Sequence, residues 1–210
     1  MPQPGGFQYR LRPRSAMLRL SLQPASLCLE PVVDLLFADW VFGYGSLIWN
    51  PEVDFNRSEL GRVHGYHRAF CIRSTHYRGT PEQPGVVLGL ERGGSCVGVA
   101  YQLRHETRRH SIERLYEREM LNSVYVPTLA AVTLANGRQV RALTFVANRD
   151  SDAYQRLSEH EILSRLSGCC GQRGANRDYA VNTHQSLQER GVHDARLARL
   201  VYQLRASGHA

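Results

Sequence analysis

The chain has 210 residues, a length that suits one domain with a substantial hydrophobic core. Hydrophobic residues make up 42% of it and charged residues 21%, and no apolar run approaches the roughly 20 residues of a membrane span. The formal charge is +7, and all 26 basic residues are arginines. This charge fits either a nucleic-acid-binding surface or an Arg-rich composition that attracts acidic small molecules. Because the arginines are scattered and no RNA-binding motif accompanies them, the second interpretation is favoured.

The cysteine and histidine patterns argue against a metal site. The chain has an odd number of cysteines and no Cys-x-x-Cys pair, which disfavours a disulfide scaffold or a zinc knuckle and fits a reducing, cytoplasmic compartment. His105 and His110 are five residues apart, so they do not share a helix face as the two histidines of a zinc-protease motif do. We therefore expect no metal.

Residues 1–38 differ from the rest and are interpreted as an N-terminal extension to a single domain over residues 39–210. Gln, Pro, Gly and Arg dominate the first residues, as in some transit peptides. More often such a segment is a loose tail, or a reading frame that is too long, with Met17 as the true start. The segment 18–29 fits a strand or a short helix packed on the core.

The most informative stretch runs from Asp39 to Pro51. Trp40 to Phe42 favour a strand, and Gly43 and Gly45 then permit a tight turn or the close approach of a ligand. Successive backbone N–H groups in such a turn form an anion-binding concavity, so we hypothesise that the loop holds a substrate carboxylate. An ordinary tight turn remains the alternative. The stretch lacks the third glycine of a dinucleotide fingerprint, the Gly-Lys-Ser/Thr of a P-loop and the Gly-x-Ser-x-Gly of a hydrolase.

Further strands follow this loop. A turn-rich segment at 77–85 separates the first strand from the second. Gly93-Gly94 predicts one hairpin, and Asn136-Gly137 predicts another more strongly. The expected strands are 63–74, 86–91, 97–103, 125–134 and 138–147.

A helix is expected over residues 105–121, and it carries a candidate catalytic carboxylate. Ile112, Leu115, Tyr116 and Glu119 recur at i, i+3, i+4 and i+7, which places Glu119 on the apolar face, whereas Arg118 should point elsewhere. Burial raises the pKa of a carboxyl group and makes it a better base near neutral pH. A structural ion pair with an arginine is the alternative.

The last third of the chain is predicted to be helical. Ser158 and Glu161 form a capping box, with Gly168 as the helix stop. A glycine-rich loop at 171–179 opens the next helix and either closes over a ligand or makes an ordinary turn. Asp194 caps a final helix. Strands early and helices between and after them indicate an α+β fold with a mixed or barrel-like sheet.

From Trp40 to Arg205 the sequence resembles the ChaC family of glutathione-specific gamma-glutamylcyclotransferases, in its bacterial form. The resemblance rests on several motifs in the same order: Val41 to Pro51, His67 to Cys71, Arg78-Gly79-Thr80 with Gln83-Pro84-Gly85, Gly98 to Tyr101, Arg118-Glu119-Met120 with Tyr125, and Gly174-Ala175-Asn176 with Tyr179. Ala180 departs from the leucine usual in the family, which affects packing more than chemistry.

This resemblance implies a partly closed mixed sheet with flanking helices and a lyase that degrades glutathione without a cofactor. It places the catalytic glutamate at Glu119 and the gamma-glutamyl-binding loop at Tyr44, Gly45, Ser46 and Leu47, next to Gly43. Arg73 and the Arg78 loop are candidates for the glycine carboxylate. Tyr125 and Tyr179 are candidate wall residues, or else core aromatics.

Two other functions remain open at this stage. One is a cyclotransferase or amidotransferase acting on another gamma-glutamyl compound. The other is a non-catalytic Arg-rich module that binds nucleic acid, which would show a steep salt dependence. We expect glutathione as the partner, and neither nucleic acid nor a membrane.

Overall fold

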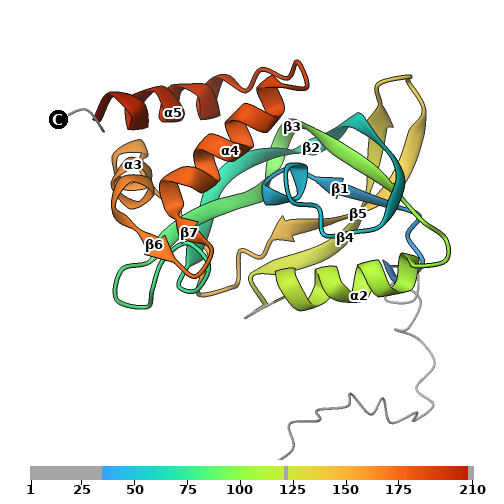
Figure 1. The fold of residues 1–210 in the computed structure, drawn as a ribbon, viewed down its shortest axis with the longest axis horizontal. Helices are drawn as coiled ribbons and strands as arrows, with labels where there is room; N and C mark the ends of the chain where they lie inside the picture. Colours follow the sequence, from blue (N-terminus) through green and yellow to red (C-terminus); the bar gives the residue numbers. More distant parts are fainter. Residues whose placement is uncertain (1–34, 121–122, 208–210) are drawn as a thin grey trace, which may run out of the picture.

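The computed structural model describes residues 35–120 and 123–207. The expectations for the segment 18–29, and for a start at Met17, fall outside these ranges. Five strands form a closed barrel in the order β1-β3-β2-β4-β5, and β3 also pairs with β5 (Figure 1). The barrel strands are β1 (Trp40–Gly43), β2 (Phe55–Ser74), β3 (Gly85–Leu103), β4 (Tyr125–Leu134) and β5 (Gln139–Ala147). The predicted α+β fold with a mixed, barrel-like sheet is confirmed.

The strand β1 lies inside the sheet and is buried on both faces. Phe42 pairs with Ala100 of β3 in antiparallel register, and Val41 pairs with Leu143 of β5 in parallel register. All four residues of β1 are buried. A strand with neighbours on both sides and side chains covered on both faces needs the uninterrupted apolar run found here.

The predicted hairpin at Gly93-Gly94 is wrong, because β3 continues through these glycines. Both halves of β3 pair with the same long strand: His64 of β2 lies opposite Ser95, and Tyr66 lies opposite Arg92. Gly93 and Gly94 have φ of +99° and +73°, and they lie beside a register shift between His64 and Tyr66. Positive-φ glycines at a β-bulge bend a strand without reversing it, which is why the turn signal misled the prediction.

The second predicted hairpin is confirmed. Strands β4 and β5 pair in antiparallel register from Tyr125↔Ala147 to Thr133↔Gln139. Gly137 has a φ of +84°, the left-handed conformation that a tight hairpin turn requires.

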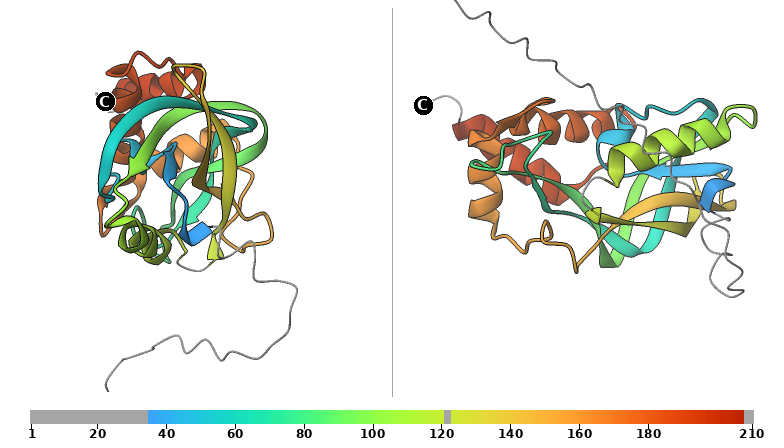
Figure 2. Two further views of the ribbon diagram at one scale, coloured as in Figure 1. Left: turned by 90° about the vertical axis from the view of Figure 1, so that its right-hand side faces the viewer. Right: turned by 90° about the horizontal axis from the view of Figure 1, so that it is seen from below.

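In the described part of the chain, α-helices flank the barrel. They are α2 (Arg108–Glu119), α3 (Glu159–Gly168), α4 (Asn176–Gln188) and α5 (Ala195–Ser207). The helices α3, α4 and α5 gather on one side of the barrel and α2 lies on the other (Figures 1 and 2). The capping box of Ser158 and Glu161 is present, and Asp194 accepts a hydrogen bond from the Leu197 N–H at the start of α5, both as predicted.

Short elements complete the architecture. The 3-10 helix η1 (Ser46–Ile48) follows β1 directly, and β6 (Cys170–Gly171) pairs with β7 (Gly174–Ala175) just before α4. The β6–β7 hairpin rests on the 76–79 loop through hydrogen bonds from the N–H groups of Gln172 and Arg173. Within the described ranges, no helix has the length and apolar character to cross a membrane.

Candidate active site

A cavity of about 650 Å³ opens where the end of α2 meets η1, the start of β4 and the β6–β7 hairpin. Its wall is rich in ionisable groups. The charged residues that line it are Glu52, Arg73, Arg78, Arg118, Glu119 and Arg173. Four guanidinium groups against two carboxylates give this cavity a positive electrostatic potential, which favours a ligand with carboxylate groups.

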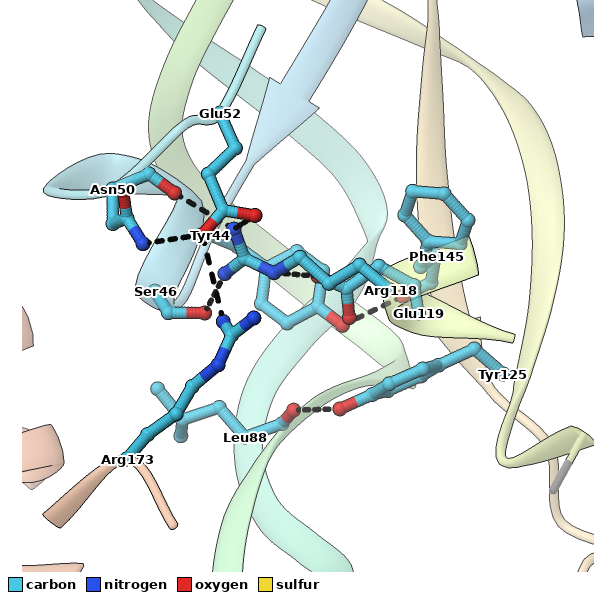
Figure 3. Close-up of polar contacts among 10 residues, drawn as sticks. All are labelled: Tyr44, Ser46, Asn50, Glu52, Leu88, Arg118, Glu119, Tyr125, Phe145 and Arg173. Carbon is cyan, nitrogen blue, oxygen red and sulfur yellow. Dashed lines mark hydrogen bonds and ion pairs between the residues drawn. The ribbon is translucent and has the colours of Figure 1, made fainter. Parts of the chain in front are cut away.

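Arg118 lies among Glu52, Glu119 and Arg173 on this wall (Figure 3). Its guanidinium donates from Nη2 to Ser46 Oγ at 2.7 Å and from Nη1 to the Asn50 carbonyl at 2.9 Å. It also pairs with Glu52 at 3.2 Å and with Glu119 Oε1 at 3.0 Å. The expectation that Arg118 points away from the apolar face of α2 is therefore wrong. Because it lies in the last turn, its long side chain reaches past the helix end into the cavity.

Glu119 is the last residue of α2 and keeps 16% of its side chain exposed, on the wall of the cavity. Its place on the buried face, beside Ile112 and Leu115, agrees with the helix periodicity. Burial raises its pKa above the ordinary value, and the nearby Glu52 adds to this effect, whereas Arg118 and Arg173 act to lower it. A carboxyl group with a raised pKa can both take up and return a proton near neutral pH.

Glu52 is held in a different state from Glu119. Burial opposes its ionisation, but Arg118, the Asn50 amide and Arg173 outweigh burial and lower its pKa. Its backbone has a φ of +52°, a conformation that costs a non-glycine residue of order 1 kcal/mol or more and that clusters at functional sites. Glu52 therefore remains ionised and fixes Arg118 and, at 3.7 Å, Arg173. Sequence inspection missed it, although the Asn-Pro-Glu turn was a usable signal.

The predicted binding loop contributes one side chain to the cavity. Ser46 lines it, whereas Tyr44 and Leu47 are buried in the core. The Tyr44 hydroxyl donates to the Phe145 carbonyl at 2.7 Å, and the Leu47 carbonyl accepts from Tyr101 at 2.8 Å. Ser46 and Leu47 open η1, so their N–H groups lie at the end of a helix that leaves such groups without an intrahelical acceptor.

The two glycines of this loop are needed for close packing. A Cβ at Gly43 would lie 2.8 Å from the Leu47 Cβ, and one at Gly45 would lie 2.8 Å from the Tyr179 hydroxyl. Larger residues would displace η1 from β1 or from the tyrosine on the cavity wall.

Tyr125 and Tyr179 both line the cavity and hold the same residue of β3. The Tyr125 hydroxyl donates to the Leu88 carbonyl at 2.9 Å, and the Tyr179 hydroxyl accepts from the Leu88 N–H at 3.2 Å. Burial raises the pKa of both phenols, so both are neutral at physiological pH.

The two arginines proposed for the far end of the substrate differ in burial. Arg73 is exposed and lies at the edge of the cavity, whereas Arg78 is buried with 7% exposure. The Arg78 guanidinium donates to the Ala175 carbonyl and stands over the rings of Trp49 and Tyr179 at 5.9 and 5.7 Å. No carboxylate of the described residues lies within ion-pair distance of it, and burial lowers its pKa.

Comparison with solved structures defines the fold class. The yeast gamma-glutamyl cyclotransferase specific to glutathione superposes with a TM-score of 0.75, covering 80% of this chain and 96% of the yeast chain at 21% identity. The fold is thus that of the gamma-glutamylcyclotransferases. The family model for ChaC-like proteins matches residues 39–207, and the chain belongs to this family.

Curated relatives extend the comparison in sequence. The glutathione-specific gamma-glutamylcyclotransferase of Escherichia coli is 39% identical over 156 residues, which cover 74% of this chain and 68% of the bacterial protein. Glutathione-specific gamma-glutamylcyclotransferase 1 of Danio rerio is 35% identical over 155 residues, or 71% of this chain and 79% of the fish protein. The human protein of the same name is 32% identical over 171 residues, or 77% of this chain and 76% of its own.

Proposed function

We propose that this protein cyclises the gamma-glutamyl group of glutathione, releasing 5-oxoproline and Cys-Gly. The observation that carries the proposal is the position of Glu119, a carboxylate with a raised pKa on the wall of an Arg-rich cavity. The names of its relatives support glutathione as the substrate.

The charges of the cavity complement those of glutathione. The tripeptide carries two carboxylates and one ammonium group, and the cavity has four arginines and two glutamates. Opposite charges arranged in this way orient a small ligand and raise its association rate.

Glu119 is proposed as the general acid and base. In its ionised form it takes a proton from the alpha-ammonium, and the freed amine attacks the gamma-carbonyl carbon. The new C–N bond closes a five-membered ring as the bond to the cysteine nitrogen breaks. Two protons leave the alpha-nitrogen in total and two reach the cysteine nitrogen, with Glu119 as the carrier, so Cys-Gly departs as an ammonium.

Orientation of the glutamyl arm in the cavity should also accelerate the reaction. A well-oriented ring closure can gain about 7–11 kcal/mol over the bimolecular reaction. We propose that the backbone N–H groups of residues 44–47 hold the alpha-carboxylate, with Gly43 allowing the close turn. Ser46 and Leu47 begin η1 and Gly45 directly precedes it, so the N–H groups of these three residues are the candidate donors. The same donors would stabilise charge that develops on the carbonyl oxygen.

The glycine carboxylate at the other end of the substrate is assigned mainly to Arg78, with Arg73 at the cavity rim in a secondary role. Arg78 is buried against two aromatic rings without a carboxylate of its own among the described residues, so an incoming carboxylate would satisfy its charge. Tyr125 and Tyr179 are proposed as walls that keep the reacting arm dry.

The free cysteines and the shared hydrophobic core bear on the location and the domain organisation of the protein. We propose a cytoplasmic protein, because Cys71, Cys96, Cys169 and Cys170 are all free thiols. We also propose that residues 39–210 form the single catalytic domain, since the barrel and its helices share one core.

The direct test is to incubate the purified full-length protein with glutathione and, separately, with gamma-glutamylalanine, each with and without EDTA. Mass spectrometry should show 5-oxoproline and Cys-Gly in equal amounts from glutathione, unaffected by EDTA. If glutathione stays intact and gamma-glutamylalanine is converted, the substrate is another gamma-glutamyl compound and not glutathione. Loss of activity in EDTA would contradict the metal-free mechanism.

A further inference from the structure

A buried ion pair outside the cavity reaches the backbone of the proposed binding loop. Arg68 lies in β2, and its side chain is only 5% exposed. Its Nη1 pairs with Asp194 Oδ2 at 2.5 Å. Its Nε donates to the Tyr44 carbonyl at 2.6 Å, and its Nη2 donates to the Val97 carbonyl at 2.7 Å. One guanidinium thus joins β2, β3, the start of α5 and the loop after β1.

The contact with Tyr44 fixes the peptide group between Tyr44 and Gly45. Because a trans peptide is planar, holding its carbonyl on the Arg68 side turns the Gly45 N–H to the opposite side. Tyr44 is also held at its other end, where its hydroxyl donates to the Phe145 carbonyl. Without Arg68 the Tyr44 carbonyl would lose this hydrogen-bond donor, and the glycine that follows resists rotation least of all residues.

Asp194 performs two tasks with its two carboxylate oxygens. Oδ2 neutralises Arg68, and Oδ1 accepts the hydrogen bond from the Leu197 N–H that caps α5. No other carboxylate of the described residues forms an ion pair with Arg68. A buried guanidinium that loses its counter-charge must shift or draw in water.

We propose that Arg68 and Asp194 form a positioning pair that sets the direction of the Gly45 N–H and, through it, the affinity of the binding loop for the gamma-glutamyl carboxylate. The inference rests on the proposed function. Neither residue lines the cavity, so both act through the loop and not on the substrate.

Two variants separate the ion pair from the helix cap. Asp194→Asn can cap α5 or accept from Arg68, but it cannot neutralise the guanidinium. Asp194→Ser keeps a capping oxygen and is too short to reach Arg68. Arg68→Lys retains the charge, but its three N–H donors lie on one nitrogen and cannot reproduce the planar fork that reaches Tyr44, Asp194 and Val97. Glu91→Gln is the control, because Glu91 is a largely buried carboxylate of β3 that forms an ion pair with the exposed Arg149, at 2.7 Å, and does not line the cavity.

The affinity for glutathione is measured by calorimetry, and the Gly45 amide resonance is measured in a ¹H–¹⁵N spectrum of the free protein. We expect Asp194→Asn, Asp194→Ser and Arg68→Lys to weaken glutathione binding about tenfold and to raise KM equally, the effect of about one charge-assisted hydrogen bond. The Gly45 resonance should move in all three, whereas Glu91→Gln should leave both the resonance and the affinity unchanged.

An unchanged affinity and Gly45 resonance in the three variants would overturn the inference and leave the pair a purely structural one, like Glu91 and Arg149. The affinity and the Gly45 resonance test the positioning pair separately from the proposed cyclisation. A wild-type protein that binds glutathione without converting it contradicts the cyclisation but still tests the positioning pair, and a wild-type protein that does neither overturns both.

Discussion

Arg118 is shared by two carboxylates whose pKa values shift in opposite directions. Glu52 has a lowered pKa, and Glu119 has a raised one, although both contact the same guanidinium. The difference arises because Glu52 is more exposed and also accepts a hydrogen bond from Asn50, whereas burial dominates at Glu119. Two neighbouring carboxylates with separated pKa values can take different roles, one as a permanent charge and one as a proton carrier.

The positive charge of Arg173 should influence the pH below which kcat/KM decreases. Since Arg173 acts to lower the pKa of Glu119, its removal in Arg173→Gln should raise that pKa further. A base with a higher pKa becomes protonated at higher pH, so the acid limb of the kcat/KM profile should move to higher pH. An acid limb that stays in place or moves to lower pH would contradict the assignment of this limb to Glu119. Arg149→Gln, outside the cavity, is the control.

Arg78 and Arg73 should contribute unequally to substrate affinity. Arg78→Met should raise KM for glutathione about tenfold or more, because it removes a charge-assisted hydrogen bond from a desolvated site. Arg73→Met should change KM less than about threefold, as expected for an exposed charge. Steady-state kinetics with glutathione give the KM of each variant. A larger increase in KM for Arg73→Met than for Arg78→Met would make Arg73 the main partner of the glycine carboxylate.

At the scale of the elements, the contact between β1 and β3 depends on Gly98. A Cβ there would lie 2.2 Å from the Gly43 carbonyl oxygen and 2.8 Å from the Phe42 ring. The clash involves backbone, which cannot yield as a flexible side chain can.

Gly98→Ala should therefore destabilise the protein by about 1–3 kcal/mol or more, the loss expected from overpacking a core. Gly168→Ala is the matched control, because its nearest atom would be a side-chain nitrogen at 3.6 Å. Urea unfolding compares the two. Equal stability of both variants would show that the barrel can open at β1 without cost.

Most elements were predictable from the sequence because local signals determine them. The Asn136-Gly137 turn, the Ser158 capping box and the Asp194 cap each require only neighbouring residues, and all are present. The β3 strand was divided in error because a Gly-Gly pair fits a bulge as well as a turn. Only the long-range pairing with β2 distinguishes these two cases.

The site was predictable in part. Helix periodicity located Glu119, but it directed Arg118 away from the cavity, because a side chain at a helix end is not confined to one face. Glu52 and Arg173 meet Arg118 only after η1 and the β6–β7 hairpin converge. The spacing of residues within one segment does not predict contacts with such distant segments.

At the scale of the whole molecule, the net charge of +7 is the feature that would favour a nucleic-acid partner. Arg68, Arg78 and Arg118 are buried, and Arg68 and Arg118 are paired with carboxylates inside the fold, so these three guanidinium groups do not form an exposed basic surface. We therefore expect no binding to RNA or DNA at low salt, measured by fluorescence anisotropy. Tight binding whose affinity falls steeply with salt would support the Arg-rich binding module instead.

The measurement that tests the central claim most directly is the rate of 5-oxoproline formation by Glu119→Gln, with the Kd for glutathione measured on the same preparation. Glutamine keeps the shape of the side chain but cannot carry a proton. We expect a folded protein that binds glutathione within about threefold of the wild type and turns it over about 10²- to 10⁴-fold more slowly. A rate near that of the wild type would contradict Glu119 as the general acid and base, and with it the mechanism.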